Sequence, residues 1–250
     1  MLGTLLHKGC TFKVDFFKPI DISIPAKASE SSVRAWYQPP MRSTPVRMDQ
    51  WIGSVAEGGH VNFNDLTINP HAHCTHTESV GHLTSELYSV HHIFKRYFFL
   101  ANLVTLLPRI KPGNQDLIIC GSDLQLDSSV WPAEALVVRT LGNSLAKMHQ
   151  NYSHTNPPYV DEDFISKLHT QGIEHLLIDL PSIDPESDGG ALLRHRQFWN
   201  MPQQSDSNKT LTELVYIPNS IPDGSYLLEL QLAPIENDAS PSRPILYKVF

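Results

Sequence analysis

Apolar residues recur along the chain in short runs, and most of these runs are typical of β-strands. Continuous apolar runs such as Ala135–Thr140 and His175–Leu180 indicate strands that are covered on both faces. The alternating stretch Val61–Ile68 indicates a strand with one covered face. Strands are predicted at Asp21–Pro25, Val46–Ile52, Val61–Ile68, Phe98–Leu107, Leu117–Cys120, Ala135–Thr140, His175–Leu180, Thr212–Ile217, Tyr226–Ala233 and Pro244–Val249.

Helix signals are few by comparison. Val160–Leu168 is predicted as a helix, because acidic residues fill its first turn and Gly172 follows its end. Ala191–Trp199 is predicted as a second helix. The regular alternation of strands and helices that marks a doubly wound sheet is absent for most of the length. We therefore expect an α/β fold: one domain spanning residues 1–250, with a mixed β-sheet or barrel and a few helices outside it.

Charge and composition exclude several classes of partner. Lys and Arg total 19 against 26 Asp and Glu, a net charge of -7, which argues against nucleic-acid binding. The apolar runs are too short or too interrupted to span a bilayer, and the first residues lack the apolar core of a secretory signal. The three cysteines form no plausible disulfide framework. We expect a cytoplasmic protein that acts on a small molecule and binds neither nucleic acid nor membrane.

Histidine is concentrated in one segment. The chain has 13 histidines, and Asn69–Thr84 reads NPHAHCTHTESVGHLT. His76 and Glu78 are two positions apart, so their side chains point to the same face of an extended segment. Histidine and carboxylate ligands suit Zn²⁺ or Mn²⁺, and a mixed set with open positions is typical of catalytic metal sites. The segment therefore predicts a metal site.

A cupin barrel is the competing interpretation, since it also places a glutamate after an HxH pair. His71, His73 and Glu78 have that spacing. The cupin motif also expects glycines on both sides, at the positions that Asp65 and Ser85 occupy here. Neither glycine is present, and the cupin interpretation is disfavoured.

The segment Cys74–His82 resembles the HxGTHxDxPxH signature of the cyclase family of metal-dependent hydrolases, which includes bacterial kynurenine formamidase and isatin hydrolase. Thr75, His76 and His82 match the signature directly. Glu78 stands where the family has aspartate, which keeps the carboxylate and lengthens it by one methylene.

Three positions depart from the signature. Cys74 replaces its glycine and Val80 replaces its proline. The first histidine of the pattern falls on Ala72, which His71 and His73 flank. The NPH turn favours His71 as the first ligand, and His73 is the alternative.

The resemblance extends from about Trp51 to the end of the chain. Ile178–Asp184 is similar to the family's central strand and following loop. His195 and Glu213 are similar to its distal histidine and glutamate, and Ala239–Pro244 resembles its closing SPxR segment.

The resemblance implies a cyclase-like β/α fold, assembly as a homodimer or homotetramer, and hydrolysis of an aryl formamide or a cyclic amide. One or two divalent ions, zinc or manganese, would activate the attacking water. The resemblance implies His82 as the general acid and base. The implied metal ligands are His71, His76, Glu78, His195 and Glu213, with Glu78 able to bridge two ions. The alternative function is a non-catalytic metal- or ligand-binding protein on the same fold, its motif loop disturbed by Cys74.

Other residues are interpreted from their own surroundings. Taken alone, His195 would be a surface residue of a helix and Glu213 a solvent-facing strand residue. Asp179, within an apolar strand, is expected to accept structural hydrogen bonds or to orient a ligand histidine. Aromatic residues that could line an apolar pocket are Trp36, Tyr37, Trp51, Phe63, Tyr159, Phe198 and Trp199.

Overall fold

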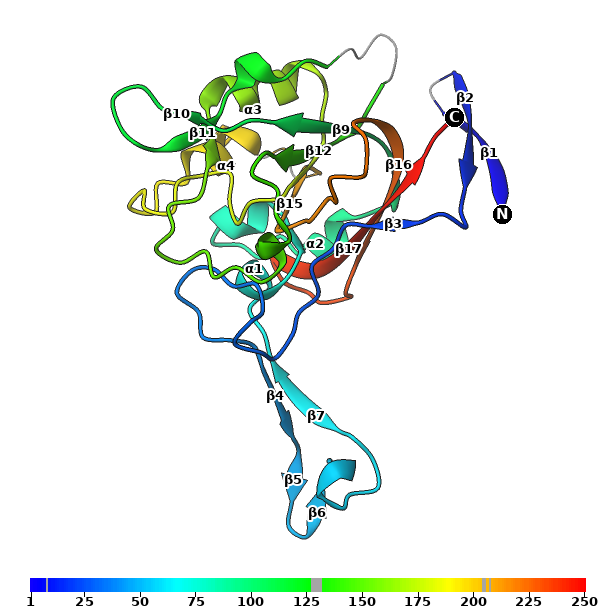
Figure 1. Cartoon of the computed structure of the whole chain (residues 1–250), viewed down its shortest axis with the longest axis vertical. Coiled ribbons are helices and arrows are strands. Elements are labelled where there is room, and N and C mark those ends of the chain that lie inside the picture. The colour runs from blue at the N-terminus through cyan, green and yellow to red at the C-terminus, as the bar shows by residue number, and fades with distance from the viewer. Residues whose placement is uncertain (8, 127–131, 204–205, 207) are drawn as a thin grey trace.

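A closed barrel of seven strands forms the centre of the computed structural model, which describes residues 1–7, 9–126, 132–203, 206 and 208–250 (Figure 1). The barrel closes because its first strand in spatial order, β16, also pairs with its last, β17. In spatial order the strands are β16 (Gly224–Leu232), β9 (Phe98–Leu106), β12 (Ala135–Thr140), β14 (His175–Ile178), β15 (Thr210–Glu213), β8 (His76–Glu78) and β17 (Ala239–Lys248).

The barrel is mixed in strand direction. β9, β12, β14 and β15 run parallel to one another, and the remaining pairs are antiparallel. Helix α3 (Glu162–Thr170) lies in the connection from β12 to β14, and α4 (Leu193–Phe198) lies in the connection from β14 to β15. Parallel neighbours need such crossovers, which is why helices occur here. The predicted α/β fold with a mixed barrel and few helices is confirmed.

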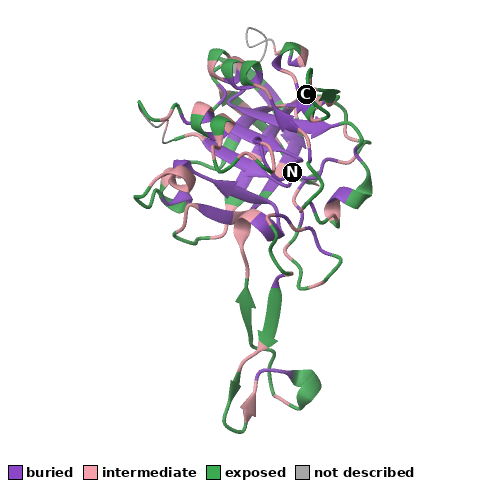
Figure 2. Ribbon diagram, turned by 90° about the vertical axis from the view of Figure 1, so that its left-hand side faces the viewer, coloured by how far each residue is buried: buried purple, intermediate pink, exposed green. Residues whose placement is uncertain are grey.

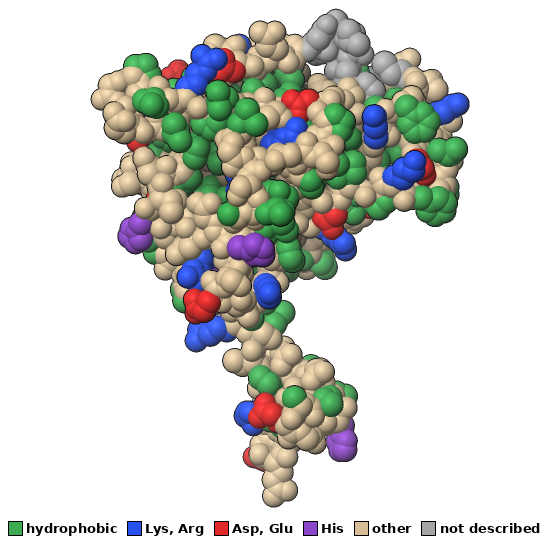
Figure 3. Space-filling model, viewed as in Figure 1, with side chains coloured by type: hydrophobic (Ala, Val, Ile, Leu, Met, Phe, Trp, Pro, Cys, Tyr) green, Lys and Arg blue, Asp and Glu red, His purple; other side chains and the backbone are tan. Residues whose placement is uncertain are grey.

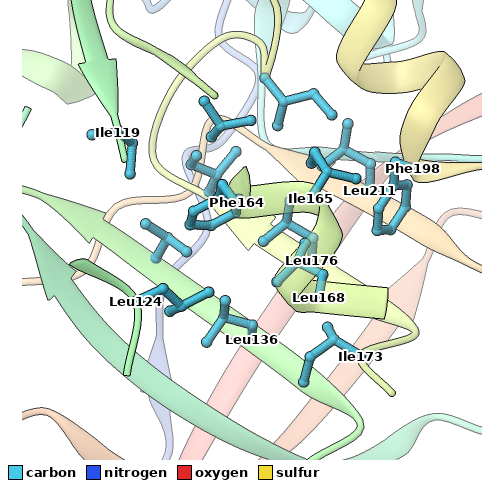
Figure 4. Packing of buried hydrophobic residues seen from close by; sticks show 14 of the residues in the cluster. Ile119, Leu124, Leu136, Phe164, Ile165, Leu168, Ile173, Leu176, Phe198 and Leu211 are labelled. Carbon is cyan, nitrogen blue, oxygen red and sulfur yellow. The ribbon is translucent and has the colours of Figure 1, made fainter. Parts of the chain in front are cut away.

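Alternate residues of β12 enter two separate apolar clusters. Leu136 and Val138 belong to the same cluster as Phe164 of α3. Figure 4 labels Leu136 and Phe164 within this cluster. Ala135 and Val137 belong to the cluster on the opposite face of the sheet. Successive strand side chains point to opposite faces, so an uninterrupted apolar run is buried throughout only when both faces are covered. Every residue of β12 is buried, as its sequence predicts.

Smaller elements surround the barrel. Strand β3 (Ile20–Asp21) extends the sheet beside β17, and it is shorter than the predicted strand Asp21–Pro25. The N-terminal hairpin and the three-stranded sheet are sheets of their own that pack against the barrel, and the hairpin was not predicted. These strands are β1 (Leu2–His7), β2 (Cys10–Asp15), β10 (Arg109–Ile110), β11 (Leu117–Ile119) and β13 (Tyr159–Val160). The short helices are α1 (Pro70–His73), α2 (Val90–Ile93), η1 (Val55–Glu57), η2 (Val80–Leu83), η3 (Gly121–Asp123) and η4 (Leu145–Met148). Among the described residues, no helix is long and apolar enough to traverse a bilayer.

Residues 42–67 form an arm that projects from the barrel (Figures 1 and 2). Its base is an antiparallel pair, β4 (Arg42–Pro45) with β7 (Asn64–Thr67). The prediction of one strand at Val46–Ile52 is wrong, because the chain turns there between β5 (Arg47–Met48) and β6 (Trp51–Ile52). The predicted strand Val61–Ile68 is only partly formed, as β7, and all four β7 residues are exposed. Alternation correctly indicated a strand, but no other described segment covers its apolar side.

The late strands differ from prediction in their limits. The predicted strand Thr212–Ile217 lies earlier, as β15, because Leu214 adopts a left-handed backbone with φ of 56° and interrupts the extended chain. β17 begins at Ala239, five residues before the predicted Pro244. Both shifts matter for function, since Glu213 ends β15 and β17 begins beside the predicted site.

Candidate metal centre

The first ligand segment is shaped by a one-turn helix. The side chain of Asn69 accepts a hydrogen bond from the backbone N–H of His71 at 3.0 Å, and Pro70 occupies the first turn of α1. The chain is extended again at Cys74, with φ of -165°, and enters β8. This turn brings His71 Nδ1 within 3.0 Å of Glu78 Oε2, in an ionic contact that lacks hydrogen-bond geometry.

The register of two antiparallel strands places the next residues. His76 of β8 is opposite Glu213 of β15, and Glu78 is opposite Leu211. Residues two apart on a strand share a face, so His76, Glu78 and Glu213 project together. His76 Nε2 lies 3.5 Å from Glu213 Oε2. All three side chains are buried, so the expectation that Glu213 taken alone would face solvent is wrong.

Helix α4 positions the side chain of His195 beside Glu78 and Glu213. Its Nε2 lies 3.2 Å from Glu78 Oε1 and 3.6 Å from Glu213 Oε1. Its other ring nitrogen, Nδ1, donates to Asp184 Oδ2 at 2.6 Å, and its backbone N–H donates to the same oxygen at 3.0 Å. Asp184 therefore fixes the ring with Nε2 directed at the two glutamates. His195 is buried, which corrects the expectation of a surface residue.

His82 completes the group from helix η2, whose first turn is capped by the side chain of Ser79. His82 Nδ1 lies 3.9 Å from Glu78 Oε2 and 3.2 Å from Asp238 Oδ2. A cavity of about 390 Å³ is lined by His82 together with His71, Glu78, His195 and Glu213. The structure thus brings together all six residues singled out from the sequence, namely His71, His76, Glu78, His82, His195 and Glu213.

The donor atoms of this cluster fit a divalent cation. His76 Nε2, both carboxylate oxygens of Glu78 and Glu213 Oε1 are buried without a hydrogen-bond partner. His76 Nδ1 donates to the carbonyl of Cys74 at 3.1 Å, which leaves a lone pair on Nε2. Buried polar atoms without partners are costly and rare, and a cation would satisfy these.

Two sets of ligand atoms converge within 4.8 Å: His71, Glu78 and His82 form one, and His76, Glu78 and Glu213 form the other. Glu78 belongs to both sets. A carboxylate offers an oxygen to each of two cations, so the arrangement can hold one ion or a pair bridged by Glu78. His195 Nε2 faces the two glutamates from the remaining side.

The electrostatics of the cluster fit a cation site as well. Burial alone would lower the pKa of His195, but Asp184 and Glu78 raise it to about 10. Burial also opposes the shift at His71, where Asp238 and Glu78 raise the pKa to about 10. The surrounding histidines outweigh burial at Glu78 and hold its pKa well below the usual range. Positive charge is therefore strongly favoured within this cluster, and protons on the histidines would compete with a metal ion for the site.

Comparison with known proteins agrees with this geometry. Residues 20–185 match the family model described as "Putative cyclase". The chain belongs to the cyclase family. Among curated proteins, none matches the chain.

Solved structures share the cyclase fold. One, a potential metal-dependent hydrolase with cyclase activity, is 15 % identical and has a TM-score of 0.63, with coverage of 92 % of this chain and 97 % of the other. Isatin hydrolase A from Ralstonia solanacearum is 13 % identical and has a TM-score of 0.61, with coverage of 92 % and 91 %. At these identities the likeness is one of fold.

Two departures from the cyclase signature are explained locally. His73 is turned away from the cluster, because its Nδ1 accepts from the backbone N–H of Asn69 at 2.9 Å and its Nε2 donates to the carbonyl of Pro39 at 2.9 Å. The geometry therefore favours His71 as the first ligand. Cys74 is buried, and burial raises the pKa of its thiol to about 12, so it is a neutral side chain.

Sequence reasoning missed two carboxylates of the cyclase site. Asp184 holds His195, and Asp238 contacts both His71 and His82. Both lie in segments that carried the family resemblance, or directly before one, which was the available signal. Asp179, the expected candidate for orienting a histidine, instead accepts from Thr140 and from Lys147 Nζ at 2.6 Å. Its role is thus the structural one of the two expected.

The candidate aromatic residues have different fates. Trp36 lines the cavity. Phe198 and Trp199 belong to the core, and the rings of Trp51 and Phe63 meet edge to face in the arm. Tyr37 and Tyr159 are not among the residues that line the cavity. Of the aromatic residues predicted to line a pocket, Trp36 alone is among the described residues that line this cavity.

Proposed function

We propose that the protein is a metal-dependent hydrolase that cleaves a carbon–nitrogen bond of an amide. The observation that carries the proposal is the set of buried, unpartnered donor atoms on His76, Glu78 and Glu213, the last two of which line a cavity. Zn²⁺ and Mn²⁺ are the proposed cofactors, because histidine nitrogens and carboxylate oxygens suit both. The proposed ligands are His71, His76, Glu78, His195 and Glu213.

A divalent cation at this site would supply Lewis acidity, which makes a water a better nucleophile near neutral pH and polarises the amide carbonyl. The chain supplies orientation. Asp184 fixes His195 by two hydrogen bonds, and the Cys74 carbonyl fixes His76 by one. Outer hydrogen bonds of this kind keep the ligand nitrogen aimed at its target.

His82 is proposed as the general acid and base. It lines the cavity, and its side chain is 29 % exposed, whereas His76 is fully buried. It would accept a proton from the attacking water and return it to the leaving amine. A residue with that role must reach substrate, and His82 has access that His76 lacks.

The proposed substrate is an uncharged aryl formamide or cyclic amide. Trp36, Pro185 and Leu192 give the cavity apolar walls. The described lining residues include no lysine or arginine, while Glu186 and Asp188 contribute negative charge. A substrate carboxylate would find no cationic partner on these walls, so we expect neutral amides to be preferred.

The first experiment measures metal and turnover together. Purified protein is analysed for bound zinc and manganese, and hydrolysis of isatin and of formanilide is followed with and without a chelator. We expect bound metal, hydrolysis of at least one of the two amides, loss of activity with chelator and recovery when metal is restored. Bound metal without turnover of either amide, or of related neutral cyclic and formyl amides, would favour the non-catalytic binding protein instead.

We propose further that the protein assembles as a homodimer or homotetramer through the arm. Met48, Phe63 and Leu66 are 57 %, 57 % and 61 % exposed there, and hydrophobic side chains are visible on the arm in Figure 3. An isolated two-stranded hairpin is marginally stable in water, and exposed apolar surface of this kind marks protein contacts.

Light scattering coupled to size exclusion tests the assembly. The wild type should elute as a dimer or tetramer, and the double variant Met48→Asp/Leu66→Asp should shift toward monomer. Leu145→Asp is the matched control, because Leu145 is 68 % exposed but lies outside the arm. A monomeric wild type at micromolar concentration would remove this proposal without affecting the metal site.

The cellular site of action is proposed to be the cytoplasm. Cys74 and Cys120 are free, and Cys74 is buried, which suits a reducing compartment.

A further inference from the structure

Asp238 lies where two sheet strands and the candidate site meet. It directly precedes β17, whose first residue, Ala239, is paired with Glu78 of β8. The Asp238 carbonyl accepts from the backbone N–H of Ser79 at 2.9 Å, and the carbonyl of Asn237 accepts from Val90 at 2.9 Å. The backbone is thus held on both sides, and the carboxylate is directed at the histidines.

One oxygen of this carboxylate contacts two imidazoles. Oδ2 lies 3.0 Å from His71 Nε2 and 3.2 Å from His82 Nδ1. Both are hydrogen-bond distances, and an aspartate side chain is ordinarily ionised at neutral pH. An ionised carboxylate can only accept hydrogen bonds, and both ring nitrogens must therefore donate.

These two hydrogen bonds give the two rings different tasks. With a metal ion in place of the second proton, His71 protonated on Nε2 would offer the lone pair of Nδ1, the nitrogen that lies 3.0 Å from Glu78. With its proton on Nδ1, His82 keeps a lone pair on Nε2 instead. His82 Nδ1 is the nitrogen nearest to Glu78 and would be the one to join a metal, but Asp238 engages it.

We propose that Asp238 is a positioning residue that divides these two histidines into a metal ligand and a proton carrier. By accepting from His82 Nδ1 it keeps that nitrogen from ligating and leaves Nε2 as the basic nitrogen for the substrate. By accepting from His71 Nε2 it aims Nδ1 at the metal. The proposal rests on the proposed function of the site, and it adds the reason why His82 differs from its neighbours.

The protonated nitrogen of His82 is measurable without any substrate. In the zinc-loaded protein, which is diamagnetic, long-range ¹H–¹⁵N NMR identifies that nitrogen. We expect the proton on Nδ1 in the wild type and a shift toward the Nε2-protonated form in Asp238→Ala. A wild-type His82 protonated on Nε2, or bound to zinc, would overturn the proposal.

Kinetics give the second readout. Loss of an outer hydrogen-bond partner costs roughly 10–100-fold in metal affinity or activity. We expect kcat of Asp238→Ala to fall by about that factor, and the isosteric Asp238→Asn to fall less because its amide oxygen still accepts. The matched control is Glu236→Ala in the same loop, whose side chain is 66 % exposed and pairs with His92. Wild-type kcat and an unchanged His82 spectrum in Asp238→Ala would also overturn the proposal.

The outcomes separate this inference from the proposed function. If neither these two amides nor related neutral cyclic and formyl amides are hydrolysed, the proposed function fails while the NMR result still decides the orientation of His82. If Asp238→Ala does not fold, the wild-type spectrum and Asp238→Asn decide the question. If turnover occurs but His82 is a zinc ligand, the function stands and the division of roles fails.

Discussion

His82→Ala is expected to leave a folded, metal-loaded protein with a kcat that is lower by about 10²–10⁴-fold, the usual contribution of a general acid and base. The reason is that the five proposed ligands remain, whereas the attacking water and the leaving amine lose their proton carrier. Steady-state hydrolysis of the amide that the wild type turns over gives the kcat. Metal analysis of the same sample gives the occupancy.

Two results would contradict that role for His82. Full activity in His82→Ala would show that the residue carries no proton in the rate-limiting step. Loss of metal together with activity would place it among the ligands, as the convergence of its ring with His71 and Glu78 permits. His91→Ala is the control, because His91 is exposed and belongs to a different segment. It should retain wild-type kcat and metal.

Glu78→Gln is expected to have the largest effect on metal binding. Glu78 is buried, both its oxygens lack a hydrogen-bond partner, and it belongs to both candidate ligand sets. Glutamine keeps the size of the side chain but removes the charge and replaces one oxygen by a donor. Because loss of an outer partner alone costs about 10–100-fold, loss of the shared ligand should weaken metal binding by more than ~100-fold. Activity should fall with the metal.

Calorimetric titration of the metal-free protein with zinc measures this loss, and thermal unfolding without metal shows whether the variant is folded. Glu86→Gln is the control, since Glu86 is exposed and follows the same motif segment. A folded Glu78→Gln protein with wild-type zinc affinity would falsify the assignment of Glu78. If one of two ions remained, Glu78 would be a ligand of a single ion only.

The spacing of residues within one segment was enough to predict a large part of the candidate site. His76, Glu78 and His82 lie within one short segment, so the geometry of a strand and one following turn already brings them near each other. Continuous apolar runs likewise predicted the strands covered on both faces, such as β12 and β14. These features follow from backbone periodicity, which sequence reports directly.

Other features depended on covering surface that lies elsewhere in the chain. Val61–Ile68 has an alternating pattern, yet β7 projects in the arm and is exposed. β15 ends at Glu213 because Leu214 takes a left-handed conformation. This conformation could not be predicted from the surrounding sequence, which is apolar and favours a strand. The sequence pattern shows which face of a strand is apolar. Tertiary packing determines whether another part of the chain covers that face.

The sequence alone determined a mixed α/β fold and a histidine–glutamate segment suited to a divalent metal. The family resemblance named His195 and Glu213, and the tertiary structure showed how they reach that segment, Glu213 through the β15–β8 register and His195 through α4. Only the tertiary structure revealed the carboxylates of Asp184 and Asp238 that orient the histidines. The reason is physical. Contacts within one turn or strand are fixed by bond geometry, whereas contacts across more than a hundred residues are fixed by strand register and helix packing, which the whole core selects.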